Sequence, residues 1–163
     1  MGDNDHPLRS RVWAAVAIFV VLAIDQAVKR WLLSGAIGLN GKNLIPGLVD
    51  VRLAWNRGVS FSLLWPSSAL GGVLLFAVAA CIVAVLLVWA FRTHRVLPAV
   101  AIGLIIGGAV SNLVDRYLYG AVFDFLAMRI GDIRLFVCNL ADIAITLGVV
   151  GLLIDGLLNR RAT

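Results

Sequence analysis

The chain has 163 residues, of which 61% are hydrophobic and 14% charged, and it carries a formal net charge of +5. Soluble domains are usually about 45 to 50% apolar, so this composition excludes an ordinary soluble protein and predicts an all-α membrane protein. The length accommodates about four spanning helices of roughly 20 residues each, which predicts one integral-membrane domain over residues 1–163. The basic residues are scattered over loops and helix ends, a pattern typical of membrane flanks and not of nucleic-acid binding.

The first predicted span covers residues 12–33 and ends in Lys29, Arg30 and Trp31, a basic and aromatic flank typical of a membrane interface. The apolar run is too long for the core of a cleaved signal peptide, so we expect it to remain as a helix. Asp25 interrupts this span one turn before Lys29. Two interpretations of Asp25 are open: an i,i+4 ion pair with Lys29, or a role at a functional site.

Residues 34–66 form the longest predicted loop, and within it residues 48–56 alternate apolar and polar side chains. This alternation is the period of a strand. The Asn-Arg-Gly sequence at 56–58 is typical of a turn, and residues 59–63 are predicted to return as a second strand. A small sheet in the first loop, lying on the membrane surface with one apolar face, would form a cradle for an extended peptide. An ordinary ordered loop is the alternative interpretation.

The second and third spans are predicted at residues 67–91 and 97–119. Their connection is short, so the two helices are expected to be antiparallel neighbours. Gly103 and Gly107 form a small-xxx-small pair that lets another helix approach closely, and Gly108 extends it.

The rest of the chain is predicted to cross over and then span the membrane a fourth time. Gly120 is typical of the residue that ends a helix. Residues 121–136 are predicted to cross over with a turn at Gly131-Asp132, and residues 137–158 form the fourth span.

An even number of spans places both termini on one side of the membrane. Under the positive-inside rule the basic clusters predicted on that side favour a cytoplasmic assignment, although six of the 14 Lys and Arg residues are expected there and eight on the opposite face. The six residues are Arg9, Arg11, Arg92, Arg95, Arg160 and Arg161.

The predicted topology brings the polar residues of the spans to the opposite face of the membrane. Asn112 shares a helix face with Asp115 and Arg116, and Asn139 shares one with Asp142. Asp142 is expected about six residues into the fourth span, roughly 9 Å below its start at about 1.5 Å per residue. Ionisable groups at membrane depth cost on the order of 2.5 to 3.5 kcal/mol, so these residues form a functional-site hypothesis.

Paired carboxylates are the chemistry that this set favours, with Asp124 and Asp142 as the candidate pair. Two acids in a low-dielectric pocket share a proton, so one can activate a water while the other protonates the oxyanion or the leaving amine. Their titration belongs to the pair, so the individual acid and base roles stay open. The chain has two His residues and no HExxH sequence, which gives no support to a metal site.

Three alternatives stand beside the carboxylate pair. A Ser60 nucleophile activated by Lys29 is less favoured, because no His is expected near Ser60. A buried structural polar network would explain the same spacing. A channel or transporter element is a further alternative, against which the second and third spans offer no polar residues that would continue a path across the membrane.

Four short motifs follow one another along the chain. They are Asp25-Gln26 with Lys29; Asn56-Arg57-Gly58-Val59-Ser60-Phe61; Asn112-x-x-Asp115-Arg116 with Val122-x-Asp124-Phe125; and Asn139-Leu140-Ala141-Asp142. In this order they resemble the motifs of bacterial lipoprotein signal peptidases, the signal peptidase II family, and the resemblance covers nearly the whole chain. It implies an intramembrane aspartic endopeptidase that removes signal peptides from diacylglyceryl-modified prolipoproteins, cutting just before the lipid-modified Cys.

The resemblance also implies residue roles. Asp124 and Asp142 would be catalytic, while the residues that shape the site, position substrate or support it would be Asn56, Asn112, Arg116, Asn139, Asp115 and Asp25. It implies a monomer in the bacterial cytoplasmic (inner) membrane, among membrane lipids, with its active site near the extracytoplasmic face and with no metal or organic cofactor. A relative that only binds lipoproteins without cutting them is the alternative.

The sequence departs from the family pattern at three places. Ser111 stands where many members have Gly, Val59-Ser60 where Ala-Ala is frequent, and Cys138 where Phe often precedes the Asn. All three lie outside the candidate pair.

Overall fold

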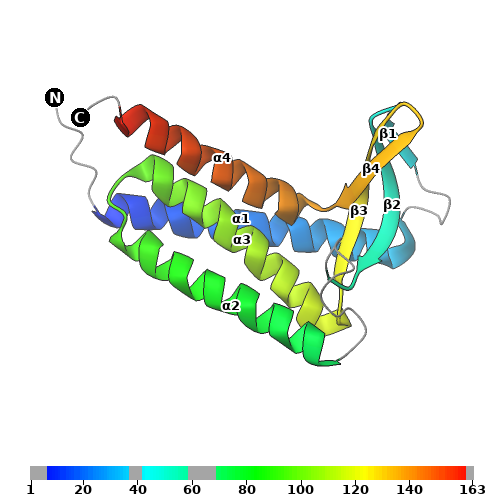
Figure 1. Cartoon of the computed structure of the whole chain (residues 1–163), viewed down its shortest axis with the longest axis horizontal. Helices are drawn as coiled ribbons and strands as arrows, with labels where there is room; N and C mark the ends of the chain where they lie inside the picture. The colour runs from blue at the N-terminus through cyan, green and yellow to red at the C-terminus, as the bar shows by residue number, and fades with distance from the viewer. Residues whose placement is uncertain (1–6, 37–41, 59–68, 161–163) are drawn as a thin grey trace.

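Four long helices form the body of the molecule, and a small sheet stands across one end of them (Figure 1). The computed structural model describes residues 7–36, 42–58 and 69–160. All four helices are long and apolar enough to cross a membrane, which confirms the four predicted spans. The helices are α1 (Pro7–Trp31), α2 (Ala69–Arg92), α3 (Val96–Tyr119) and α4 (Leu140–Arg160), and a short π-helical turn, η1 (Leu32–Ala36), follows α1.

Two helix boundaries differ from the prediction. The first helix begins at Pro7 instead of residue 12. Proline is well suited to a first helical position because its fixed φ matches the helix and its missing N–H would have no partner there. The last helix begins at Leu140 instead of residue 137, because Val137 and Cys138 belong to a strand. Gly120 ends α3 as predicted, with a left-handed φ of 69° and its N–H donated to the Arg116 carbonyl oxygen.

Helix α3 lies at the centre of the bundle and contacts each of the other three helices. Its glycines allow two neighbours to approach closely, as the small-xxx-small pattern predicted. A Cβ added to Gly103 would lie 2.6 Å from the carbonyl oxygen of Ala14, and one added to Gly107 would lie 2.8 Å from that of Ile18, both in α1. Any larger residue would therefore push α1 away from α3.

The sheet has four antiparallel strands in the order β1-β2-β3-β4. These are β1 (Lys42–Ile45), β2 (Val49–Asn56), β3 (Val122–Ile130) and β4 (Ile133–Cys138). The strand predicted at residues 48–56 is confirmed as β2. The return strand predicted at residues 59–63 lies outside the described residues. The partners of β2 are β1, from the same loop, and β3, from the segment between α3 and α4.

The segment at residues 121–136, predicted as a plain crossover, is instead largely the hairpin β3-β4. Its predicted turn at Gly131-Asp132 is confirmed. The first half of β3 is buried on both faces, so its sequence is almost continuously apolar and lacks the alternation by which a half-buried strand is recognised.

An apolar cluster fixes the sheet to the helix ends. Phe123 and Phe125 of β3 pack with Val51 of β2 and Leu32 of η1, and Val28 and Leu140 lie against this group. Burying a large apolar side chain contributes about 1.5 to 3 kcal/mol, so this cluster is sufficient to hold β3 in place over α1 and α4.

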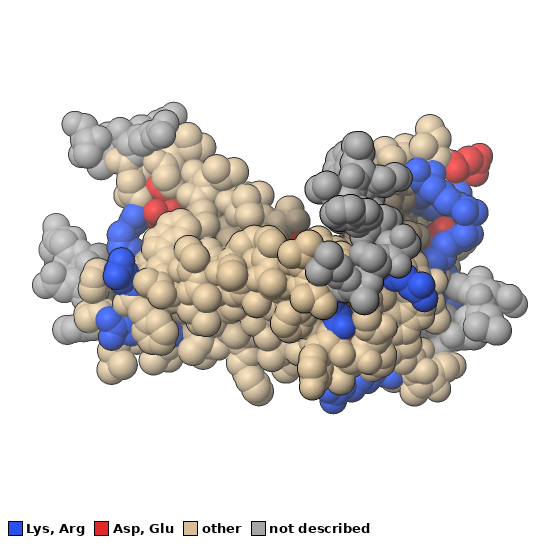
Figure 2. All heavy atoms as spheres, turned by 60° about the horizontal axis from the view of Figure 1, so that its bottom comes forward, with Lys and Arg blue, Asp and Glu red and all other residues tan. Residues whose placement is uncertain are grey.

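Among the described residues, charged side chains lie toward the two ends of the molecule. In Figure 2 the middle of the face turned to the viewer is almost entirely uncharged, while Lys and Arg side chains gather at both ends. Many large apolar side chains on the helices are exposed, among them Phe19, Val73 and Leu153. A membrane would cover this apolar belt.

Candidate active site

Asn139 and Asp142 form a reciprocal cap at the start of α4. The Asn139 Oδ1 accepts the N–H of Asp142 at 2.9 Å, and the Asn139 N–H donates to Asp142 Oδ2 at 3.2 Å. This is the arrangement of a capping box, which satisfies N–H groups that have no partner within the helix. Asp142 is therefore the third residue of α4 and lies in its first turn, so the predicted position about six residues inside the span was wrong.

Asp124 reaches the same place through the sheet. It lies on β3 opposite Ala54 of β2, and its side chain is only 2% exposed. Asn56, two residues beyond Ala54, donates its Nδ2 to Asp124 Oδ2 at 3.1 Å, and Asn139 donates its Nδ2 to Asp124 Oδ1 at 2.7 Å. The Gly58 N–H donates to Asn56 Oδ1 at 3.0 Å, which fixes the amide so that its nitrogen faces the carboxylate.

Asn112 joins α3 to the two aspartates. Its Nδ2 donates to Asp142 Oδ1 at 2.9 Å, and its Oδ1 accepts from Asn139 Nδ2 at 3.1 Å and from Lys29 Nζ at 3.3 Å. Because two donors occupy the Asn112 oxygen, only its nitrogen is free to face Asp142. The predicted convergence is thus observed for five residues, which we call the aspartate–asparagine cluster: Asp124, Asp142, Asn56, Asn112 and Asn139.

A buried charged group lies beside this cluster. Lys29 Nζ is 2.7 Å from Asp25 Oδ2 and 2.7 Å from Asp115 Oδ2, and the three side chains are between 0% and 2% exposed. We call these three residues the lysine cluster. Of the two interpretations left open for Asp25, the ion pair with Lys29 is confirmed. Lys29 in turn contacts Asn112 of the aspartate–asparagine cluster, and a role of Asp25 at a functional site stays a prediction.

The lysine cluster ties the site to the surrounding backbone. Asp25 Oδ1 accepts the N–H of Ala141 in the first turn of α4 at 3.0 Å. Asp115 Oδ2 accepts the N–H of Phe123 in β3 at 3.1 Å. The elements that carry Asp142 and Asp124 are therefore both anchored to buried carboxylates.

Two further residues, which were not predicted at the site, donate hydrogen bonds to the lysine cluster. Ser111 donates its hydroxyl to Asp25 Oδ2 at 2.6 Å, and Gln26 donates its Nε2 to Asp115 Oδ1 at 2.8 Å. Ser111 therefore supplies a hydrogen bond that a glycine at this position would not. The signal in the sequence was the polar pair Gln26 and Lys29 inside an apolar run.

Arg116 occupies a more open position on α3. Its side chain is half-buried, and within the described part of the chain its guanidinium makes no hydrogen bond or ion pair. The carboxylates whose charge acts on it are those of Asp142, Asp124 and Asp115. A free guanidinium next to these carboxylates is available to an incoming group.

Burial raises the pKa of Asp124 to about 6. The hydrogen bond from Asn56 opposes this rise, the negative charge of Asp142 adds to it, and the hydrogen bond from Asn139 opposes it again. An acid with a pKa near neutrality can hold a proton and release it, which general acid catalysis needs.

Thiol and metal chemistry find little support at this end of the molecule. Burial raises the pKa of Cys138 to about 11, so its thiol is a poor nucleophile near neutral pH. Among the described residues, no group of three or more His, Cys, Asp or Glu side chains is arranged to hold a metal ion. Carboxylates with amide donors make up the cluster, which is suited to acid–base hydrolysis.

Comparisons with known proteins agree with this chemistry. Residues 17–158 match the model of the signal peptidase (SPase) II family. A lipoprotein signal peptidase of Methylorubrum extorquens (strain PA1) is 45% identical over 87% of this chain and 84% of its own. One of Nitrobacter hamburgensis is 40% identical over 96% of each chain. A bacterial membrane enzyme solved by the in meso method at 2.3 Å resolution has a similar fold, with a TM-score of 0.76 at 25% identity over 90% of this chain and 88% of the other. The chain therefore belongs to the signal peptidase II family.

Proposed function

We propose that this protein removes signal peptides from prolipoproteins and that Asp124 and Asp142 are its catalytic pair. The observation that carries the pairing is Asn139, whose side chain donates to Asp124 at 2.7 Å and whose backbone N–H donates to Asp142 at 3.2 Å. One residue therefore contacts both carboxyl groups, which supports their acting as a pair. The relatives' printed name, lipoprotein signal peptidase, supports the substrate class.

We assign the resting proton to Asp124 and the negative charge to Asp142. Asp124 is almost completely buried and has a raised pKa of about 6, and burial favours the neutral form of a carboxyl group. Asp142 is only partly buried and accepts hydrogen bonds from the Asn112 side chain and the Asn139 backbone, so its carboxyl group is held where it can take a proton from a water.

The proposed reaction follows from this assignment. Asp142 takes a proton from a water as the water oxygen attacks the scissile carbonyl carbon, and Asp124 gives its proton to the carbonyl oxygen. The resulting gem-diol collapses when Asp142 passes its proton to the amide nitrogen. The C–N bond breaks, and Asp124 regains a proton from one of the two hydroxyls. Both aspartates end in their starting states, with no metal or cofactor in any step.

The remaining site residues receive positioning roles. Asn56, Asn112 and Asn139 hold the two carboxyl groups through the amide contacts described above. Lys29 and its two aspartates orient Asn112 and anchor β3 and α4. We assign Arg116 to the substrate side of the site, where its guanidinium would bind a carbonyl oxygen of the signal peptide.

We further propose that both termini face the cytoplasm and that the site opens near the extracytoplasmic face. The described ends of α1 and α4 lie together at the end of the bundle remote from the sheet (Figure 1). Arg9 and Arg11 in the first turns of α1 and Arg92 and Arg95 at the junction of α2 and α3 lie at that end, which supports its cytoplasmic assignment, although the sheet end carries Lys and Arg side chains as well. A lipid-modified Cys keeps its acyl chains in the membrane, so the bond just before it would lie near the interface, level with the first turn of α4.

The test compares wild type with Asp124→Asn and Asp142→Asn on a purified diacylglyceryl prolipoprotein in lipid, followed by the mass of the products. We expect only wild type to release the signal peptide and to leave the lipidated Cys at the new N-terminus. A normally active Asn variant would refute the pair. Lipoprotein binding without cleavage by wild type would instead identify a non-catalytic binding protein.

Orientation has a separate test. Single cysteines at Asp132, in the β3-β4 turn, and at His94, between α2 and α3, are introduced into a variant that lacks Cys81 and Cys138. Intact cells are then treated with a membrane-impermeant maleimide. We expect labelling at position 132 only, and labelling at position 94 only would reverse the proposed orientation.

A further inference from the structure

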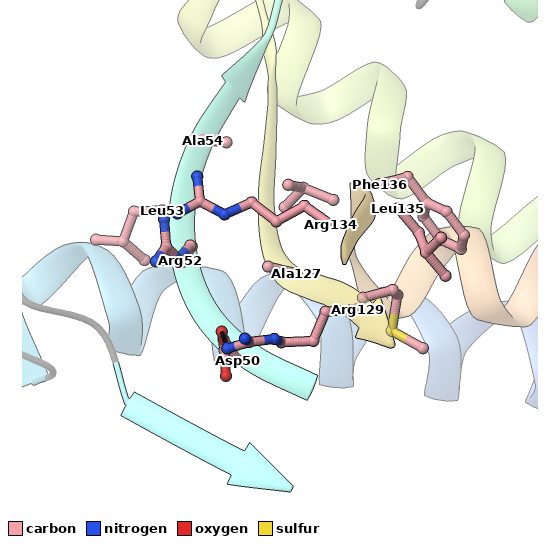
Figure 3. Close-up of a pocket in the computed structure, with 11 residues that line it drawn as sticks. Asp50, Arg52, Leu53, Ala54, Ala127, Arg129, Arg134, Leu135 and Phe136 are labelled. Carbon is pink, nitrogen blue, oxygen red and sulfur yellow. Dashed lines mark hydrogen bonds and ion pairs between the residues drawn. The ribbon is translucent and has the colours of Figure 1, made fainter. Parts of the chain in front are cut away.

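A pocket of about 330 Å³ lies on the sheet and is lined by β2, β3 and β4 (Figure 3). Three arginines line it, Arg52, Arg129 and Arg134, together with a single acid, Asp50. Its walls therefore carry two positive charges in excess. In Figure 3 the Arg134 side chain extends across β3 toward Arg52 on β2. The pocket is distinct from the aspartate–asparagine cluster, none of whose residues lines it.

The three arginines are not equivalent. Arg129 is held by protein groups, since it donates to Asp50 Oδ2 at 3.0 Å and to the Gly131 carbonyl oxygen at 2.6 Å. Arg52 and Arg134 are exposed, and neither has an ion-pair partner among the described residues. The pocket thus presents two uncommitted guanidinium groups, and a guanidinium binds phosphate through paired N–H donors.

The construction of the sheet disfavours a polypeptide as the ligand. A peptide adds to a sheet through a free strand edge, where unpaired backbone groups give most of the affinity. Of the strands that line the pocket, β2 and β3 are inner strands with a partner on each side, and only β4 has a free edge. A peptide could therefore pair with the sheet only along the outer edge of β4, whereas the arginines offer any ligand a positive charge.

The surroundings indicate a lipid as the source of that charge. The sheet stands at the ends of four membrane-spanning helices, the level at which lipid headgroups lie. Exposed apolar side chains, including Leu53, Leu135 and Phe136, line the pocket beside the arginines. Guanidinium groups next to apolar side chains match the boundary between lipid phosphate and acyl chain.

One buried hydrogen-bond acceptor in the pocket wall narrows the choice of lipid headgroup. Asp50 is 6% exposed, and its Oδ1 has no hydrogen-bond partner among the described residues. A headgroup that carries hydroxyl donors beside its phosphate would complement this wall. We propose that the pocket binds the headgroup of an anionic phospholipid, phosphatidylglycerol in the first instance, with the phosphate on Arg52 and Arg134.

A lipid bound in this pocket would contact the strand β2, which also pairs with the strand that carries Asp124 of the proposed catalytic pair. Ala54 lines the pocket and is the register partner of Asp124. The lipid site does not depend on the catalytic assignment, so either can fail without the other.

The test is native mass spectrometry of the full chain in detergent, titrated with phosphatidylglycerol or phosphatidylcholine. We expect wild type to bind one phosphatidylglycerol in preference to phosphatidylcholine. Arg52→Gln/Arg134→Gln should raise the half-saturating concentration at least about tenfold, because it removes the charge-assisted hydrogen bonds. The matched control Arg30→Gln/Lys42→Gln removes two exposed charges near the same end but outside the pocket, and it should change the value less than about twofold.

A variant that is expected to bind the lipid more tightly keeps the test decisive if the arginine double variant does not fold. Asp50→Asn keeps an acceptor oxygen for the headgroup hydroxyls but removes the negative charge of the only acid among the described lining residues and releases Arg129, so it should lower the half-saturating concentration. Weaker binding by Asp50→Asn, unchanged binding by the arginine double variant, or an equal loss in the control would overturn the proposal. Displacement of the lipid by equimolar inorganic phosphate would make this a site for free anions, and displacement by an acidic peptide would make it a substrate site. Either result would refute a phospholipid site.

Discussion

Removing the charge of Lys29 tests the structural account most directly. Lys29 is 2% exposed and lies 2.7 Å from each of two buried carboxylates, those of Asp25 and Asp115. Lys29→Met would leave both acids buried and facing one another without a cation. Breaking a buried ion pair by removing one partner costs about 3 to 5 kcal/mol, so we expect a loss of that size in the free energy of unfolding. Arg30→Met is the matched control, because it removes an exposed charge from the next position and should change stability by about 0.5 kcal/mol or less.

The assay is reversible unfolding of the purified chain in detergent, titrated with a denaturing surfactant and followed by circular dichroism. Adding Asp25→Asn and Asp115→Asn to Lys29→Met removes the uncompensated charge, and we expect it to restore at least about half of the lost stability. A loss of stability for Lys29→Met no larger than that for Arg30→Met would refute a buried ion pair that stabilises the fold. A triple variant no more stable than Lys29→Met would refute uncompensated charge as the cause of the loss.

Three further predictions concern the site and its support. Burial raises the pKa of Asp124 to about 6, so kcat/KM should fall about tenfold per pH unit above pH 6, as Asp124 loses its proton. Asn56→Ala removes a hydrogen bond that lowers this pKa, so in that variant the fall in kcat/KM should begin at a higher pH. Asn139→Ser keeps a capping oxygen but loses the amide that holds Asp124. The melting temperature should therefore stay within a few degrees while kcat falls about tenfold or more. A large fall in melting temperature alongside the loss of kcat would indicate a purely structural role. A Cβ on Gly108 would collide with the main chain of α4, so Gly108→Ala should lower the free energy of unfolding by about 1 to 3 kcal/mol. Gly156 has open space around it, so Gly156→Ala should not destabilise the protein. Equal melting temperatures for the two variants would contradict the close packing at Gly108.

The membrane spans could be predicted from the sequence because a helix that crosses the bilayer needs about 20 consecutive apolar residues. The strand at residues 49–56 could also be predicted, since apolar and polar side chains alternate along it in the sequence. The strand β3 could not, because Phe123, Asp124 and Phe125 are all buried and leave no alternation to detect. Only the pairing with β2, a contact between distant parts of the chain, identifies it as a strand.

The sequence predicted which residues form the site better than it predicted where they lie. Asp142 was expected deep in the last helix, yet the sequence Asn139-x-x-Asp142 carries the spacing of a capping box, which would have set the helix start correctly. The contact of Lys29 with Asn112 depends on how α1 and α3 are rotated about their axes, and helical spacing within one segment does not fix that rotation. The catalytic roles of Asp124 and Asp142 stay a prediction until the variants are assayed.

The hydrogen bond from the Ala141 N–H to Asp25 bears on how the enzyme is made. It joins residues 116 positions apart, from the first and the last membrane helix. During synthesis α1 can insert with Asp25 and Lys29 already paired within one helix, while the proposed catalytic pair lacks Asp142 until the final helix has been translated. If Asp124 and Asp142 are the catalytic pair, a ribosome-bound chain that has inserted three helices has no complete proteolytic centre, and cleavage would start only after α4 has joined the bundle.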